Sequence, residues 1–246
     1  MPATVDTLTP NKRVLMIVSN PAVSGQTGWP IGFWWAEVTH PYWEFVEHGY
    51  EVTVASPDGG PVEADGFSDP EHESGYSAHD IVSLGFKKSP VHSALLQNTP
   101  RLRDVDLSTY DAIFLAGGQG PMYTFRGNAD VYTAFAHFFD EGKPAAAVCH
   151  ATTILVDAQA ADGSLIVRGR TWTGFANAEE HYADEFVGQK IQPYWIEDQA
   201  RAMNDTNFIT NGIFKPFAVR DGNLITGQQQ YSGAAAARLV VEALGI

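Results

Sequence analysis

The single cysteine of the chain, Cys149, is followed directly by a histidine in the stretch KPAAAVCHATT at 143–153. The apolar run before it predicts that Cys149 lies where a buried strand turns into a helix. Ala147 and Ala151 supply the small side chains that such a sharp turn needs on either side. We expect the turn to bring helix N–H groups to an exposed sulfur, which lowers the pKa of a thiol. An inert, buried cysteine is the competing interpretation.

Two other segments carry groups that could assist a thiolate. The stretch LAGGQG at 115–120 ends a predicted strand, and its glycines allow a backbone N–H of Gly118 or Gln119 to face the same cleft as an oxyanion donor. Glu37 lies among apolar side chains in GFWWAEVTHP at 32–41, where desolvation raises the pKa of a carboxyl and makes it a candidate proton shuttle. A simple turn and an exposed helical glutamate are the competing interpretations.

Acidic and aromatic residues could complete such a site. In TGFANAEEHYADEF, Glu179 or Glu180 could orient the imidazole of His150 as a third catalytic member, although a solvated acidic run is the alternative. Three tryptophans are close enough to Glu37 in the sequence to wall a small apolar pocket or a subunit contact: Trp29, Trp34 and Trp35.

Histidines elsewhere are weaker candidates. An acidic loop could bind a divalent metal through His72, Glu73, His79 and Asp80, but this spacing fits no strong ligand pattern and a solvated loop is favoured. We therefore predict no metal. His40 lies one helical turn from Glu37, and either a structural role or a place in the pocket wall fits it.

Strand-like apolar runs alternate with helical patterns, which indicates an α/β fold with a mostly parallel sheet and helices on both faces. We predict strands at 12–19, 50–57, 110–118 and 143–149, and helices at 33–48, 90–98, 128–141, 150–160 and 232–245. Pro41 should kink or divide the first helix. A long loop is predicted at 58–80.

The second half of the chain has a different pattern. Short strands are predicted at 164–169 and 170–175, followed by an irregular region to about residue 205. Asp221-Gly222 between two β-like runs predicts a small β-hairpin near the C-terminal half. We expect an N-terminal tail, 1–11, and one domain, 12–246, because no repeat or linker divides the chain.

Composition narrows the function classes. The 246-residue chain has a formal net charge of −14, which argues against binding to nucleic acid or to anionic membranes. One cysteine cannot form an internal disulfide. No apolar run approaches the length of a membrane span, and the N-terminus lacks the features of a signal peptide. We expect a cytoplasmic protein.

Together these features resemble the ThiJ/PfpI superfamily, which has a class I glutamine amidotransferase-like, flavodoxin-like fold. The resemblance is closest to its glyoxalase-III-like and heat-shock-chaperone-like branch. It spans nearly the whole chain from about residue 12, in TGWPIGFWWAEVTHPYWEF, GYEVTVASPDGG, DAIFLAGGQGPM, GKPAAAVCHATTIL, RTWTGFANAEE and DGNLITGQQQYSGAAAARLV. It implies a doubly wound domain that forms a homodimer and needs no cofactor.

The resemblance also implies roles for individual residues. Cys149 matches the nucleophile, and Glu37 matches the glutamate that hydrogen-bonds the sulfur and moves protons. His150 matches the histidine after the nucleophile, and Glu180 matches its acidic partner. The Gly118 region and the backbone N–H of His150 match the oxyanion hole.

The chain also departs from the pattern of this branch. Gln119 stands where the branch usually has histidine in its GGHG motif, and the acidic residue often found soon afterwards is missing from PMYTFRGN. Ala151 stands where glycine is frequent. The first two departures change the pocket wall and therefore put the substrate of the branch in doubt. We place Gln119 and Trp35 in that wall with Gly118.

The leading functional prediction is a cofactor-free glyoxalase that converts a 2-oxoaldehyde such as methylglyoxal, with water, to a 2-hydroxy acid. A hydratase or amide hydrolase that uses the same thiolate is the alternative among enzymes. A stress chaperone or a redox sensor, in which Cys149 is oxidised, is the alternative from another class.

Overall fold

A six-stranded sheet forms the centre of the molecule, which we describe from a computed structural model over residues 12–245. The tail predicted at 1–11 lies outside the described residues. The strands follow the spatial order β4 (Glu51–Ala55), β1 (Arg13–Ile17), β5 (Ala112–Leu115), β6 (Ala145–Val148), β10 (Leu224–Gly227) and β9 (Ala218–Asp221). All neighbours pair in parallel except β10 and β9. The predicted hairpin is thus present and forms one edge of this sheet.

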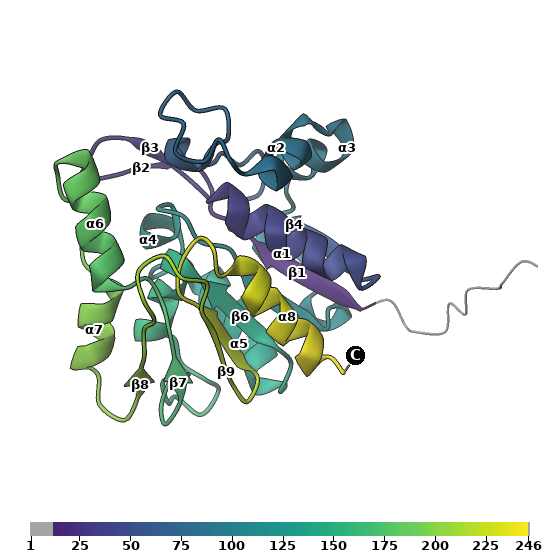
Figure 1. The fold of residues 1–246 in the computed structure, drawn as a ribbon. Coiled ribbons are helices and arrows are strands. Elements are labelled where there is room, and N and C mark those ends of the chain that lie inside the picture. The colour runs from purple at the N-terminus through teal and green to yellow at the C-terminus, as the bar shows by residue number, and fades with distance from the viewer. Residues whose placement is uncertain (1–11, 246) are drawn as a thin grey trace, which may run out of the picture.

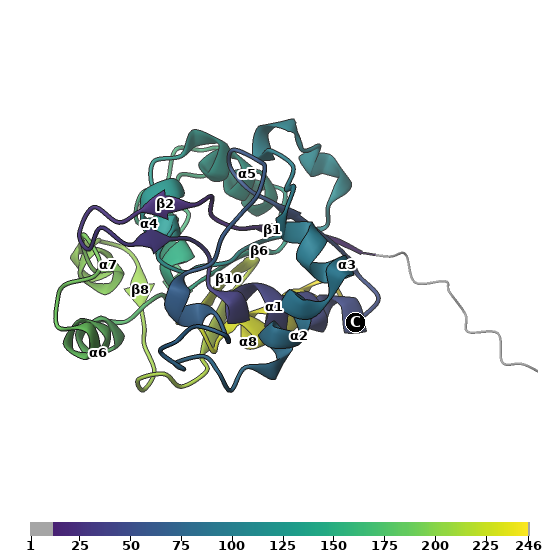
Figure 2. The ribbon, with the colours of Figure 1, turned by 90° about the horizontal axis from the view of Figure 1, so that it is seen from above.

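Helices cover both faces of the sheet, as predicted. Figure 2 shows α1 (Trp35–Glu47) and α8 (Gly233–Ala243) on one face, with α5 (Ala129–Asp140) on the other. The strands between them are buried on both sides, since Val14 to Ile17 and Ala145 to Val148 have no exposed surface. This double burial is why the central strands are continuous apolar runs rather than alternating ones.

Smaller elements lie around the sheet (Figure 1). Two short pairs, β2 (Ala22–Val23) with β3 (Pro30–Ile31) and β7 (Thr171–Trp172) with β8 (Asn207–Phe208), lie outside it. The remaining α-helices are α2 (Ile81–Lys88), α3 (Pro90–Ser93), α4 (Pro121–Thr124), α6 (Asn177–Val187) and α7 (Ile196–Ala202). Short 3-10 helices occur at Gly66–Ser68, Ala94–Leu96, Leu102–Asp104, Leu107–Thr109 and Cys149–Val156.

Several local predictions were wrong. The region expected to be irregular contains α6 and α7, and the stretch 164–169 forms turns rather than a strand. The helix predicted at 150–160 is the 3-10 helix Cys149–Val156. Of the two outcomes predicted for Pro41, division does not occur, since α1 runs through this residue as one helix, and the kink stays a prediction. Within 12–245, no helix has the length and apolar character that a membrane crossing requires.

The order of strands determines where chemistry can occur. The neighbouring strands β5 and β6 end at the same edge of the sheet, and β5 leads into Gly117 whereas β6 leads into Cys149. Ligands of such sheets bind beyond the carboxyl ends of the strands. The fold therefore brings the glycine-rich turn and the cysteine together.

Candidate active site

Cys149 has a backbone conformation that only a strongly held residue adopts. Its φ angle is 58°, in the left-handed region that disfavours residues with a side chain. The residue is the first of the 3-10 helix that follows β6, and the Thr152 hydroxyl donates a hydrogen bond to its carbonyl (2.7 Å). This is the sharp strand-to-helix turn that the sequence predicted.

The Glu37 carboxyl lies beside the sulfur and is completely buried. Its Oε2 accepts a hydrogen bond from the Gly117 N–H (2.9 Å), whereas Oε1 has no ordinary hydrogen-bond partner among the described residues. Burial raises the pKa of Glu37 to about 7, although its contact with the Cys149 thiol and the Gly117 N–H lower it. A Cβ atom on Gly117 would lie 2.6 Å from Glu37 Oε2, so only glycine allows this approach. The buried acid with a raised pKa that the sequence predicted is therefore present.

The buried acid makes the stability of the protein depend on pH. Because the folded-state pKa of Glu37 lies above its ordinary value of 4.5, its contribution to stability is complete below about pH 4.5 and is lost as the pH rises through about 7. Glutamine has no such titration. We expect Glu37→Gln to gain stability relative to wild type between pH 4.5 and pH 8, by on the order of 2 kcal/mol. Urea unfolding of both proteins across this range checks it, and a constant difference would contradict it.

The Cys149 thiol differs from the prediction in its acidity. Burial and the neighbouring Glu37 raise its pKa well above the ordinary value, while the backbone N–H groups of Gly118 and His150 lower it only in part. The side chain is 2% exposed. The predicted low-pKa thiolate is therefore wrong, because desolvation and the neighbouring Glu37 outweigh the N–H groups. The two N–H groups do converge on the sulfur, as an oxyanion site needs.

A chain of contacts links the sulfur to a second carboxylate. His150 Nδ1 lies 3.3 Å from Cys149 Sγ, and His150 Nε2 lies 3.0 Å from Glu180 Oε1. The imidazole also stacks on Phe175, with ring centroids 4.1 Å apart. Burial disfavours the imidazolium, but Glu180, together with the more distant Glu37 and Asp65, outweighs this effect and raises the pKa of His150. With its Nε2 proton donated to Glu180, His150 can accept the thiol proton at Nδ1.

The structure separates the two candidate glutamates. Glu180 lies on the face of α6 toward His150, whereas the Glu179 carboxylate accepts hydrogen bonds from the backbone N–H groups of Ala176 and Phe214 and from the Gln228 amide. Glu179 thus holds surrounding segments in place, and Glu180 is the one that orients the imidazole.

A pocket opens over these groups, with a volume of about 670 Å³ including the part open to solvent. Gly118, Gln119, Cys149, His150 and Glu180 line it, as does Trp34. The prediction for Trp35 was wrong. That side chain is 7% exposed and packs in the core against Phe33 and Phe86, because consecutive residues at the start of α1 point to different sides.

Asp65 is a buried residue of this region that the sequence analysis missed. Its carboxyl accepts hydrogen bonds from the backbone N–H groups of Gly32 (3.0 Å) and Gln119 (2.6 Å), and burial raises its pKa to about 7. It therefore fixes the turn that carries Gly118. The signal available was one acidic residue in the long loop 58–80, where solvated acids surround it.

Other candidates do not join the site. His40 Nε2 contacts Asp80 Oδ1 (3.0 Å) and does not line the pocket. Across residues 12–245, His, Cys, Asp and Glu form no group of three or more that could hold a metal ion.

The profile of the DJ-1/PfpI family matches residues 32–243. The chain belongs to the DJ-1/PfpI family. Glyoxalase 3 of Candida albicans is 25% identical to it over 236 residues, which cover 94% of this chain and 98% of that protein. The structure of the 24 kDa rapid encystment protein of Francisella tularensis has 25% identity and a TM-score of 0.84, covering 96% of this chain and all of that one.

A glyoxalase III structure from Candida albicans has the same fold as this DJ-1/PfpI protein, with a TM-score of 0.77. It is 23% identical and covers 94% of this chain and 97% of its own. The predicted superfamily is thus confirmed, and so is its fold.

Proposed function

We propose that this DJ-1/PfpI protein is a glutathione-independent glyoxalase that converts a 2-oxoaldehyde and water to a 2-hydroxy acid, with Cys149 as nucleophile. One observation carries the proposal: a single sulfur lies between an imidazole paired with a carboxylate and a second, buried carboxyl whose pKa is raised to about 7. The names of relatives, such as Glyoxalase 3 of Candida albicans, support the same reaction.

The first step forms a carbon–sulfur bond. The thiol proton passes to His150 Nδ1, and Glu180 stabilises the resulting imidazolium. The sulfur adds to the aldehyde carbon, and the carbonyl electron pair becomes an oxyanion. The N–H groups of Gly118 and His150, which face the sulfur, are placed to donate to it.

The second step moves hydrogen between the two carbons. The His150 imidazolium first returns its proton to the oxyanion, which gives a hemithioacetal and a neutral imidazole. Glu37, as carboxylate, or His150 then removes the proton from the former aldehyde carbon to give an enediol, and the same group returns a proton to the adjacent carbon. This internal redox exchange leaves a thioester of the 2-hydroxy acid. Water hydrolyses the thioester and restores the thiol, so no external oxidant or cofactor is consumed.

The reaction can be tested directly. Purified protein incubated with methylglyoxal should form lactate, and added glutathione should not change the rate. Lactate is measured by an enzyme-coupled assay, with heat-denatured protein as the control. If no lactate forms above that control, the proposal is wrong.

The contact chain from Cys149 through His150 to Glu180 also favours a second reaction class. The same arrangement activates a thiol for attack on amides or nitrile-like carbons, as in a hydratase or amide hydrolase. A panel of small amides and isonitriles separates the two classes by product. The raised pKa of the buried thiol gives no support to a redox-sensor role, because peroxide reacts with the thiolate.

We further propose, on the resemblance to this branch of the family, that the protein acts as a homodimer in the cytoplasm. Exposed apolar side chains on α2 and α3, among them Ile81 and Val91, offer a surface for subunit contact. Light scattering of the purified protein tests the dimer.

A further inference from the structure

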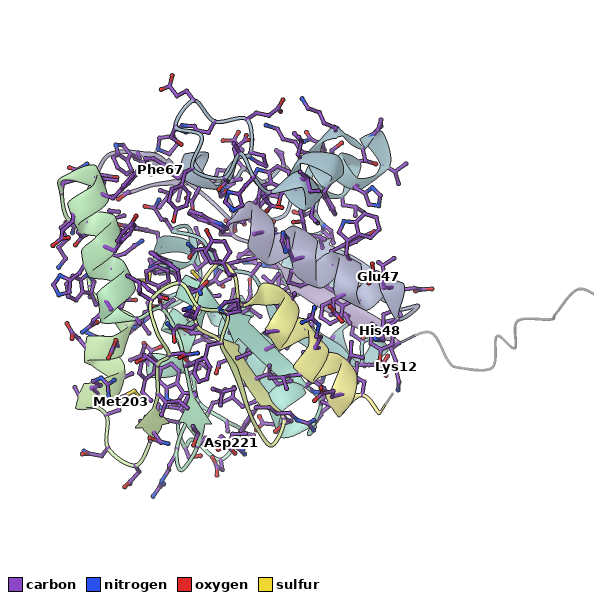
Figure 3. All side chains as sticks on the ribbon, in the orientation of Figure 1. Lys12, Glu47, His48, Phe67, Met203 and Asp221 are labelled. Carbon is purple, nitrogen blue, oxygen red and sulfur yellow. The ribbon has the colours of Figure 1, made fainter. Side chains whose placement is uncertain are left out.

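Seven aromatic side chains form a connected wall around the mouth of the pocket, which we call the aromatic wall. The ring centroids of neighbouring members lie within 6.4 Å of one another, as for Tyr182 and Phe186, and those of Tyr182 and Phe214 are 5.2 Å apart. Figure 3 labels Phe67, which lies near one end of α6. Phe186 lies on the last turn of that helix, and the ring centroids of Phe67 and Phe186 are 6.2 Å apart. The members are Trp29, Trp34, Phe67, Tyr76, Tyr182, Phe186 and Phe214.

The charges of the pocket complement a neutral ligand. Within the described chain, the lining residues include neither lysine nor arginine. Glu180 is the one carboxylate among them, and it is occupied by His150. A substrate with a carboxylate or phosphate would lose its hydration there without gaining a lysine or arginine partner, and the one imidazole of the lining, His150, is already paired with Glu180, so its binding is unfavourable.

Two glutamine amides supply polar groups to the pocket lining beside the aromatic wall. Gln192, in the segment between α6 and α7, is 1% exposed and lines the pocket, yet its Oε1 has no hydrogen-bond partner in the structure described. Oε1 of Gln119 is buried in the same way. Buried polar groups almost always have partners, and whichever way an amide is turned it can accept and donate one hydrogen bond. These amides are therefore suited to a polar group of a bound molecule.

From these features we infer that the substrate is a neutral 2-oxoaldehyde with an aryl substituent, and that Phe186 and Gln192 determine this specificity. The inference rests on the proposed function for its reactive group. The substituent packs against the aromatic wall, since aromatic pairs prefer the offset and edge-to-face arrangements that the wall already shows. The Gln192 amide accepts a hydrogen bond at Oε1 from a hydroxyl group of the ligand, such as that of the hydrated aldehyde or of the hemithioacetal, or donates one through its NH2 group to a carbonyl oxygen. Methylglyoxal has the same reactive carbons, but its methyl group cannot form these aromatic contacts with the aromatic wall.

The experiment compares three substrates that share the dicarbonyl group: methylglyoxal, phenylglyoxal and 4-carboxyphenylglyoxal. We expect kcat/KM to be at least tenfold higher for phenylglyoxal than for either of the others. Phe186→Ala should lower the phenyl-to-methyl ratio at least fivefold, mainly through KM. Val23→Ala, which truncates an exposed apolar side chain on β2 that does not line the pocket, is the control and should leave the ratio unchanged.

Gln192→Leu gives a second, independent readout. Because leucine replaces an amide oxygen that lacks a partner, the melting temperature should stay the same or rise. The KM for phenylglyoxal should nevertheless increase at least fivefold. A KM for phenylglyoxal that Gln192→Leu leaves unchanged would overturn the inference. So would equal kcat/KM values for phenylglyoxal and methylglyoxal in wild type, if Phe186→Ala left them equal.

Binding to the Cys149→Ala variant separates this inference from the proposed function. Acetophenone should quench tryptophan fluorescence of the variant at concentrations at least tenfold lower than acetone does, because it needs the wall but no chemistry. If acetophenone binds in this way and no oxoaldehyde is converted by wild type, the glyoxalase proposal fails and the aryl-binding pocket stands. If oxoaldehydes are converted without aryl preference, the pocket inference fails and the glyoxalase stands.

Discussion

Replacing Cys149 with alanine should lower kcat/KM for 2-oxoaldehydes by at least about 10³-fold and leave the protein folded. The loss follows because every covalent step of the proposed mechanism passes through this sulfur, and removal of a nucleophile leaves only binding and oxyanion stabilisation. Alanine has the same difficulty at φ 58° as cysteine and is only slightly smaller, so the free energy of unfolding should change by about 1 kcal/mol or less. Lactate formation and thermal melting measure the two effects.

Cys149→Ser is the companion variant, because it keeps the size of the side chain and replaces only the nucleophilic atom. It should be as inactive as Cys149→Ala at neutral pH, since a serine hydroxyl ionises far less readily than a thiol. Activity of either variant within tenfold of wild type would show that the sulfur is not the reacting atom.

Replacing Glu37 with glutamine should lower kcat by about 10²–10⁴-fold with little change in KM. Glutamine can still accept the hydrogen bond from the Gly117 N–H, so the geometry around the sulfur is kept. It cannot shuttle a proton, and general acid–base catalysis contributes an effect of this size. The pH profile of kcat/KM, which should bend near pH 7 in wild type because the pKa of Glu37 in the free enzyme is about 7, should lose that bend.

Glu179→Gln is the matched control for this experiment. It also replaces a buried carboxylate, but Glu179 contacts neither the sulfur nor His150 and holds Phe214 and Gln228 instead. It should lower the melting temperature and change kcat less than tenfold. If both variants reduced kcat equally, burial of charge rather than proton transfer would explain the loss.

Local sequence patterns predicted the parts of the site that local structure determines. The apolar run, the small neighbours and the position of Cys149 were sufficient to predict its turn, because a sharp strand-to-helix junction has few solutions. The apolar and aromatic residues next to Glu37 in the sequence predicted its burial and its raised pKa. The order of strands then brought Gly118 and Cys149 to one edge of the sheet.

Features that depend on distant segments could not be predicted in this way. The aromatic wall joins the loop that carries Phe67 to α6, and no pattern in either segment shows that the two meet. Asp65 and Gln192 resemble ordinary polar loop residues until the chain around them is folded. The acidity of Cys149 was wrong because it depends on depth of burial and on contact with Glu37, which outweigh the nearby N–H groups.

Helix α6 carries both Glu180, which sets the basicity of His150, and Tyr182 and Phe186, which face the incoming molecule. Substrate selectivity and the basicity of the His150 imidazole consequently depend on the position of the same helix. A change in the tilt of α6 that admits a different compound would also move Glu180 and so change the basicity of His150. Among close relatives, changes in substrate selectivity should therefore be accompanied by shifts in the pH optimum of activity.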